Sequence, residues 1–218
     1  VAENTPAVLE TWFAGSQAGN AIADVLFGDV NPGGKLPATF PRTVGQVPLY
    51  YNHFNTGRPP DAKNKYTSKY LDVDWTPLFP FGYGLSYTKF EITNLRLSAQ
   101  RIPPNGKVTV TVDIRNTGKR AGDEVVQLYL RDLAATVTRP VKELKGFQRV
   151  TLRPGEKRTL TFTLKPEDLS DFCPAVASAF RGLSETISTA SRTIPRPTNR
   201  ASHAHTGFEM ITFFYLRP

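Results

Sequence analysis

The residues best suited to contact a ligand lie in a stretch rich in aromatic and basic side chains, residues 50–75. Aromatic rings can stack on sugar rings while polar neighbours bond the sugar hydroxyls, so this composition predicts a carbohydrate-contacting surface. Equally, the rings could anchor the segment to its own protein, and the sequence slightly favours this second interpretation. The rings are Tyr50, Tyr51, Phe54, Tyr66, Tyr70 and Trp75, with Arg58, Lys65 and Lys69 among them. The candidates for substrate binding are the three rings Tyr66, Tyr70 and Trp75.

Metal and cofactor chemistry is not supported by the residue types. The single cysteine, Cys173, has no internal disulfide partner, and His53, His203 and His205 supply no tetrahedral metal set. The glycine turn at residues 15–19 precedes a predicted helix and could bind an anion through free N–H groups. It matches neither phosphate-loop pattern, however, and close packing of a strand on the helix explains its glycines better. We therefore predict no metal and no cofactor.

The formal charge of +8 raises the question of a nucleic-acid partner. The basic residues are scattered and often stand beside acids, as in Arg131-Asp132 and Lys142-Glu143, which is typical of a solvated surface. No run approaches the roughly 18 apolar residues of a membrane span, and the first residues lack the basic start and apolar core of a signal peptide. We predict neither a nucleic-acid nor a membrane partner, and the missing initiator Met suggests a fragment.

The first 40 residues read as a strand, a tight turn and a helix. Residues 7–13 form a short apolar run, which predicts the strand. Apolar residues then recur at three- and four-residue spacing on one face, which predicts a helix over 16–27 that ends at Gly28 in a left-handed cap. The members of that face are Ala18, Ala21, Ile22, Val25 and Leu26.

Two further regions follow along the chain. Residues 41–80 are rich in Pro, Gly, Asn and Tyr without a sustained period, which indicates a long irregular segment that wraps a neighbouring surface. From residue 90 apolar and polar residues alternate, and turn residues separate the runs. Strands are predicted over 90–98, 107–115, 123–131, 141–150 and 157–165, in an antiparallel β-sandwich.

Several blocks of sequence together resemble glycoside hydrolases of family 3, of the bacterial periplasmic β-glucosidase type. The resemblance runs over about residues 7–172, and the blocks stand in the order that the family has them. They are residues 9–37, 40–42, 66–70, 80–87, 116–118, 122, 125–129, 139–140, 144–147 and 154–156. The longest, Leu-Glu-Thr-Trp-Phe through Asn-Pro-Gly-Gly-Lys-Leu-Pro, is a family signature.

The resemblance implies a domain plan and a hydrolytic parent protein. It places the end of an α/β sandwich domain at 1–40, an aromatic-rich linker at 41–87, a fibronectin type III-like sandwich at 88–172 and a divergent tail at 173–218. In the family one catalytic carboxyl comes from a (β/α)8 barrel and the other from upstream in the second domain. Seven acids before residue 88 are better interpreted as helix, turn and surface acids: Glu3, Glu10, Asp24, Asp29, Asp61, Asp72 and Asp74. We therefore assign no catalytic residue.

We expect this chain to be an inactive C-terminal fragment of a retaining β-glucosidase. The parent protein is expected to be periplasmic or secreted, and a homodimer of it is left open. The alternative is a carbohydrate- or surface-binding module on a fibronectin-like fold. The tail leaves the family pattern and resembles the product of a shifted reading frame, although a real appended tail is also open. The sandwich is thus expected to be incomplete, with Val110, Val112, Leu128, Leu130 and Phe162 exposed and the chain prone to aggregate.

Overall fold

The alternation of apolar and polar residues beyond residue 88 forms strands where the sequence predicts them. The computed structural model describes residues 4–103, 105–132, 138–169 and 208–209. All five predicted strands are confirmed, with small shifts at their ends. They are β1 (Phe90–Leu97), β2 (Val108–Asn116), β3 (Gly122–Asp132), β4 (Glu143–Leu152) and β5 (Lys157–Leu164). A two-residue strand, β6 (Phe208–Glu209), pairs with the end of β3.

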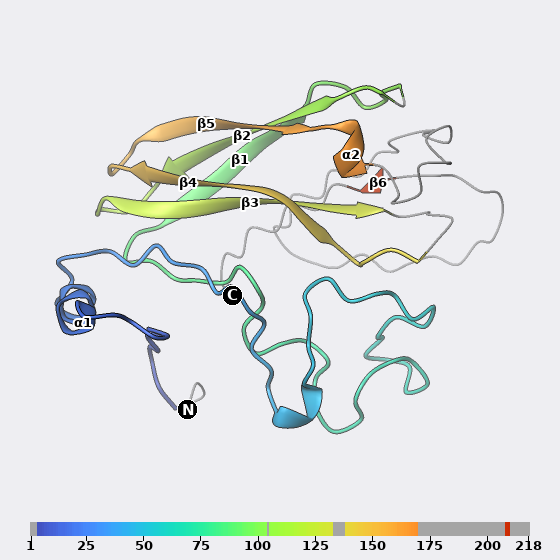
Figure 1. The fold of residues 1–218 in the computed structure, drawn as a ribbon, viewed down its shortest axis with the longest axis horizontal. Helices are drawn as coiled ribbons and strands as arrows, with labels where there is room; N and C mark the ends of the chain where they lie inside the picture. Colours follow the sequence, from blue (N-terminus) through green and yellow to red (C-terminus); the bar gives the residue numbers. More distant parts are fainter. Residues whose placement is uncertain (1–3, 104, 133–137, 170–207, 210–218) are drawn as a thin grey trace.

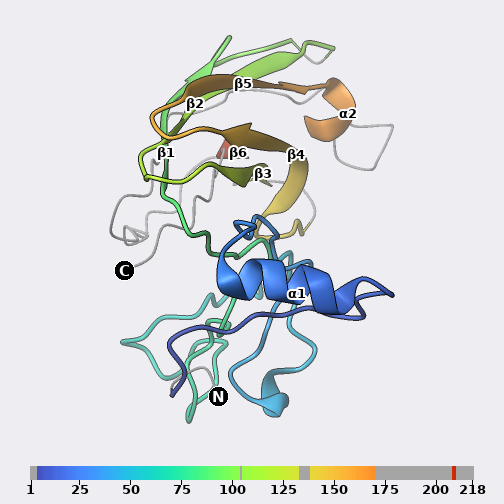
Figure 2. The ribbon, with the colours of Figure 1, turned by 90° about the vertical axis from the view of Figure 1, so that its left-hand side faces the viewer.

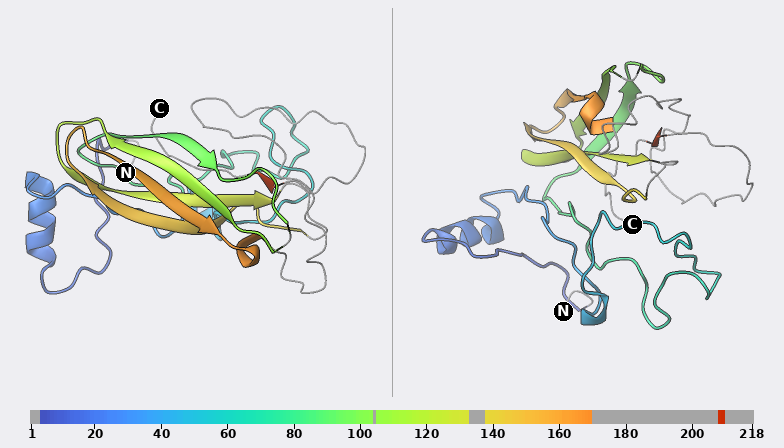
Figure 3. Two further views of the ribbon diagram at one scale, coloured as in Figure 1. Left: turned by 90° about the horizontal axis from the view of Figure 1, so that it is seen from above. Right: turned by 45° about the vertical axis from the view of Figure 1, so that its right-hand side comes forward.

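The strands form two antiparallel sheets of three strands each, in the orders β1–β2–β5 and β4–β3–β6. The sheets stack face to face, and residues 4–88 lie on the outer side of the β3–β4 layer (Figure 1). Seen from above, the strands of both layers run in the same general direction (Figure 3), as in an aligned sandwich. The predicted antiparallel sandwich is therefore present.

The inward side chains of both sheets build one apolar core. Across β2 and β5, Val110 pairs with Phe162, and β3 contributes Leu128 from the opposite sheet. The prediction that these side chains and their neighbours Val112 and Leu130 would be exposed is wrong, because all five are buried. An inward face is covered by the opposite sheet rather than by further strands of its own sheet, so a short sheet can still bury its centre.

The N-terminal segment contains one helix and no strand in its described residues. Helix α1 (Ala18–Phe27) confirms the predicted helix, and Gly28 closes it at φ 84° with its N–H bonded to the Val25 carbonyl at 3.2 Å. The predicted strand over 7–13 is wrong, since no described strand lies beside it to share hydrogen bonds. The packing explanation for Gly15 and Gly19 is also wrong, because a Cβ at either would meet nothing within 4 Å.

Residues 41–87 are irregular, as predicted. Their one regular element in the described structure is a short 3-10 helix, η1 (Val44–Gln46). Isolated bridges join Phe40 to Phe79 and Phe54 to Pro140, so the segment folds back on itself and reaches the sandwich. In the view of Figure 2 this segment and α1 lie below the sandwich. A short helix, α2 (Pro166–Leu169), follows β5 and buries Leu169 in the core.

Within the described residues, no helix combines the length and the apolar character needed to cross a membrane. In the same part of the chain, no three His, Cys, Asp or Glu side chains gather in a way that could hold a metal ion.

The most deeply buried polar side chain of the sandwich is Asn116, at the end of β2, with none of its surface exposed. Its Oδ1 accepts hydrogen bonds from the Thr88 hydroxyl at 2.8 Å and from the Gly118 N–H at 3.0 Å. Its Nδ2 donates to the carbonyls of Arg120 at 2.7 Å and Leu152 at 3.0 Å. This one side-chain amide therefore links the segment just before β1, the turn between β2 and β3, and the end of β4.

We expect Asn116→Ala to lower the free energy of unfolding by about 3 kcal/mol, because it leaves buried donors and acceptors without partners. Urea denaturation followed by circular dichroism measures the change. The matched control is Arg115→Ala, an exposed neighbour on the same strand, which we expect to shift stability by less than about 0.5 kcal/mol. Equal effects of the two substitutions would contradict the role given to Asn116.

Candidate functional site

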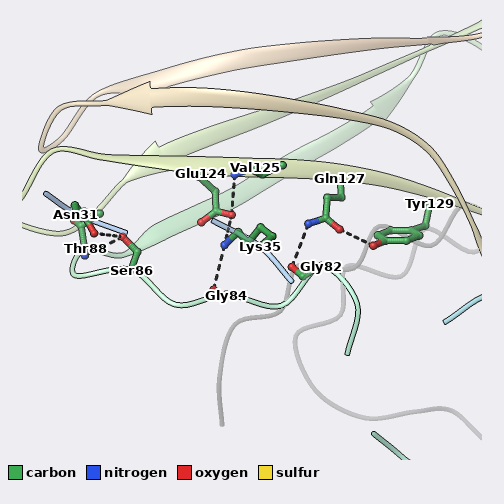
Figure 4. Close-up of polar contacts among 10 residues, drawn as sticks. All are labelled: Asn31, Lys35, Gly82, Gly84, Ser86, Thr88, Glu124, Val125, Gln127 and Tyr129. Carbon is green, nitrogen blue, oxygen red and sulfur yellow. Dashed lines mark hydrogen bonds and ion pairs between the residues drawn. The ribbon is translucent and has the colours of Figure 1, made fainter. Parts of the chain in front are cut away.

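Segments that are far apart in the sequence meet on β3. Residues 29–37 and 80–88 run beside each other, with the Leu36 N–H bonded to the Tyr83 carbonyl and the Gly82 N–H to the Leu36 carbonyl, both at 2.8 Å. Side chains of β3 reach both segments, as Figure 4 shows for Glu124 and Gln127. We call this arrangement of residues 29–37, 80–88 and 121–129 the joint.

A partly buried ion pair holds the joint together. The Lys35 ammonium lies 2.7 Å from a Glu124 carboxylate oxygen, and the two side chains are only 13% and 15% exposed. The same ammonium donates to the Gly84 carbonyl at 3.1 Å. Lys35 thus contacts both of the other parts of the joint, β3 and residues 80–88. Glu124 Oε1 also accepts from the Val125 N–H at 3.1 Å, so each charged group has a second hydrogen-bond partner. Such additional bonds offset part of the hydration that a poorly solvated ion pair loses.

Asn31 is the second polar link of the joint. Its Nδ2 donates to the Ala121 carbonyl at 3.0 Å, just before β3. Its Oδ1 accepts from the Ser86 hydroxyl at 2.9 Å and from the Tyr87 N–H at 2.8 Å. One amide side chain therefore binds the sandwich and the chain that leads into it.

Aromatic contacts extend the joint along β3. Tyr51 stacks on Phe81 with ring centroids 4.3 Å apart and meets Tyr129 edge to face at 5.9 Å. The Tyr129 hydroxyl donates to Gln127 Oε1 at 2.5 Å, and Gln127 Nε2 donates to the Gly82 carbonyl at 3.1 Å. Burial raises the pKa of Tyr129 well above its ordinary value, so the phenol stays protonated and acts as a donor.

The base of the aromatic loop, residues 50–75, is held by the polar side chains just before it. Gln46 is almost fully buried and bonds the Arg42 N–H at 2.6 Å and the Asp74 carbonyl at 2.8 Å. Arg42 donates through Nε to the Thr76 carbonyl at 2.9 Å and through Nη2 to the Thr76 hydroxyl at 3.1 Å. The two ends of this loop are therefore closed on each other.

The three predicted substrate-binding rings lie in this loop but contact different neighbours. Tyr66 is 73% exposed, with the Lys65 ammonium 5.1 Å from its ring centroid. Tyr70 is 44% exposed, and its hydroxyl donates to the Gly45 carbonyl at 3.2 Å. Trp75 is half-buried, and the Lys69 ammonium lies 5.8 Å from its ring centroid. Tyr66 thus offers the largest exposed face, while Tyr70 is bonded to the loop's base.

The pKa shifts found among the described carboxyl groups all run downward. Hydrogen bonds from the Thr76 N–H and hydroxyl lower the pKa of Asp74. Lys157, then Thr159 and Asn94, hold the pKa of Asp113 far below its ordinary value. Bonds from Thr151 and Arg149 lower that of Asp123, and bonds from Arg153 and Arg158 lower that of Glu156. These four groups remain ionised at neutral pH, which does not suit a general acid.

The joint was not predicted as such from the sequence, although its glycines were a usable signal. At Gly82, where φ is 80°, a Cβ would clash with the Gln127 amide, and at Gly84 it would clash with the Gly34 carbonyl oxygen. At Gly33 it would lie 2.7 Å from the Asp123 Cβ. Glycines in 29–37 and 80–88 therefore permit the close approach of backbones. Nothing in the sequence alone identifies Glu124 as the partner of Lys35.

Gly34 and Gly84 offer a matched pair of substitutions, because a Cβ at Gly34 would meet nothing within 4 Å. We expect Gly84→Ala to cost about 1–3 kcal/mol through the clash with backbone. Gly34→Ala should cost less than about 0.5 kcal/mol, as for an open surface position. The measurement is the urea midpoint together with the rate of proteolysis within residues 80–88. Similar behaviour of both variants would mean that the joint has room for a side chain at Gly84.

Comparison with family models assigns both parts of the chain. Residues 1–87 match the glycosyl hydrolase family 3 C-terminal domain, and residues 124–178 match a fibronectin type III-like domain. The joint thus links a segment of the first domain to the first strand of the second match, β3.

Curated relatives and solved structures agree with this assignment. The chain is 57% identical over 169 residues to a periplasmic beta-glucosidase of Salmonella typhimurium, covering 77% of this chain and 22% of that protein. It is 52% identical over 170 residues to a beta-xylosidase of Formosa agariphila, covering 78% and 23%. The crystal structure of a Listeria innocua beta-glucosidase in complex with gluconolactone matches with a TM-score of 0.73 at 48% identity, covering 77% of this chain and 23% of that one.

The chain spans about a fifth of the length of these relatives. The predicted resemblance is confirmed by both family models and by relatives that carry beta-glucosidase names. The chain belongs to glycoside hydrolase family 3, of which it holds the C-terminal part with a fibronectin type III-like domain.

Proposed function

We propose that this chain is the C-terminal part of a retaining β-glucosidase that hydrolyses terminal β-glucosyl residues. The observation that carries the proposal is the 57% identity to a periplasmic beta-glucosidase over 169 residues. The alignment covers 77% of this chain, and a Listeria innocua beta-glucosidase structure covers the same share at a TM-score of 0.73, which supports the proposal. By the same likeness the complete protein is periplasmic or secreted, and its partner is a β-glucoside or oligosaccharide substrate.

In this proposal the chain supplies no catalytic carboxyl group. A retaining glycosidase needs two carboxyl groups about 5–5.5 Å apart, one nucleophile and one acid with a raised pKa. Among the described residues, the carboxyl groups with a shifted pKa all have it lowered, whereas the catalytic acid needs a raised one. Glu124 is paired with Lys35. Both reacting groups then lie upstream in the complete enzyme, in a (β/α)8 barrel and in the preceding part of the second domain.

The role left to this chain is to present the aromatic loop at the border of the sugar-binding cleft. Closure of the loop's base by Arg42 and Gln46 supports this role, because it fixes where the loop emerges. Tyr66 is the ring best placed to stack on a sugar, since most of its surface is exposed. Tyr70 and Trp75 would shape the same border with less free surface.

Two other functions are distinguishable from this one. The beta-xylosidase relative at 52% identity supports a β-xyloside substrate, which differs from a glucoside by the absent hydroxymethyl group. A stand-alone carbohydrate-binding module would use the same rings without any hydrolysis. Assays of the complete protein on aryl β-glucoside and aryl β-xyloside distinguish glucosidase from xylosidase activity. Hydrolysis of neither substrate would support the binding module.

The purified 218-residue chain is expected to release aryl alcohol from an aryl β-glucoside no faster than buffer does, because neither catalytic carboxyl belongs to it. A chromogenic assay at high protein concentration makes the measurement. The complete protein under the same conditions is the control. Turnover by the chain that disappears when any single acid in it is replaced would overturn this assignment.

In the complete protein we expect Tyr66→Ala to raise KM for an oligosaccharide by roughly fivefold to tenfold, because about 1 kcal/mol of stacking is lost. Tyr66→Phe, which keeps the ring, is the matched control and should stay near the parent value. Tyr70→Ala and Trp75→Ala test the remainder of the border. Unchanged kcat and KM in all three alanine variants would show that the loop is only structural.

A further inference from the structure

Helix α1 lacks the features that usually stabilise a helix of its length. It has 10 residues, whereas an isolated helix shorter than about 12–15 residues is marginal in water. None of its residues is buried, and Leu26 and Phe27 near its end are exposed. Within the described residues, apolar packing therefore contributes little to holding α1.

The helix α1 also lacks charged side chains of its own that would offset its helix dipole. Gln17 at the N-cap makes no side-chain capping bond, and there is no acid in the first turn and no base in the last. The last carbonyls of a helix lack partners within it and carry the negative end of the dipole. The chain that follows supplies part of what is missing, since the Val30 N–H bonds the Asp24 carbonyl at 3.0 Å.

Side chains from the sandwich and from the chain entering it supply the rest. Arg120, in the turn between β2 and β3, donates from Nη2 to the Gly28 carbonyl at 3.0 Å across 92 positions of sequence. The Tyr87 hydroxyl donates to the Val25 carbonyl at 2.8 Å. The Arg120 guanidinium carbon lies 5.9 Å from the Tyr87 ring centroid, so the two side chains also contact each other. In Figures 1 and 2, α1 lies beneath the end of the sandwich where β3 begins.

We propose that Arg120 and Tyr87 form a carbonyl clamp, by which the fibronectin-like sandwich orders and orients α1. The clamp brings a cation to the negative end of a helix that has no base of its own there. Asn31 aligns both clamp residues, because it bonds the Ala121 carbonyl next to Arg120 and the N–H of Tyr87. The sandwich is therefore the positioning element for this helix of the family 3 domain.

The clamp predicts a specific pattern of amide hydrogen exchange in the 218-residue chain. Arg120→Ala should speed exchange in residues 21–28 by roughly five- to tenfold, the factor expected for loss of one solvent-exposed hydrogen bond. Tyr87→Phe, which removes only the hydroxyl, should act in the same direction. Exchange in β2 should not change in either variant. The readout is independent of hydrolysis, so it does not depend on the proposed function.

Two further variants sharpen the result. Lys119→Ala removes a neighbouring positive charge in the same turn and should leave α1 exchange at the parent rate, while Arg120→Lys keeps the charge and should give an intermediate rate. Unchanged α1 exchange in both Arg120→Ala and Tyr87→Phe would overturn the proposal. So would α1 amides that already exchange as in an unstructured peptide in the parent, or equal acceleration in β2 and α1.

Discussion

The close approach of three backbone segments at the joint is the constraint on which the arrangement of the described part of the chain depends. Residues 29–37, residues 80–88 and β3 lie so near one another that side chains at Gly82 and Gly84 would clash with their neighbours. Two polar side chains, Asn31 and Lys35, then bridge the segments with hydrogen bonds and an ion pair. Where α1 and the aromatic loop lie relative to the sandwich follows from this geometry.

The sandwich and the joint are stabilised by different physical means. The sandwich buries a continuous apolar core between two sheets, and its stability is dominated by the hydrophobic effect. The joint relies on directional contacts, because hydrogen bonds and a weakly solvated ion pair tolerate only a narrow range of positions. Apolar contacts resist separation of two bodies but allow sliding, whereas these polar contacts also fix the register. An ion pair of this kind therefore contributes mainly specificity of arrangement.

The sequence predicts local elements well because their causes are local. Alternation in β2 and β5 and the glycine after α1 act within a few residues, and the strands and the helix were predicted on those grounds. The predicted strand over 7–13 failed because a strand needs a partner, which the short apolar run does not reveal. The burial of Val110 and Leu128 was not predicted for a related reason, because the side chains that bury them belong to the facing sheet. Pairings across the chain, such as Lys35 with Glu124, leave no periodic trace in the sequence.

The signature residues of the family acquire a different meaning once their contacts are known. Asn31 bonds the chain just before β3, Lys35 pairs with Glu124 on β3, and Gly82 lies against Gln127 of β3, so these motif residues take part in the contact between two domains. A motif of this kind identifies a family reliably because an interface of close backbones permits few substitutions. The joint and the aromatic loop thus differ in how their residues are held. In the loop the base is closed by hydrogen bonds of Arg42 and Gln46, whereas Tyr66 near its tip is exposed, so solvent rather than packing surrounds most of that ring.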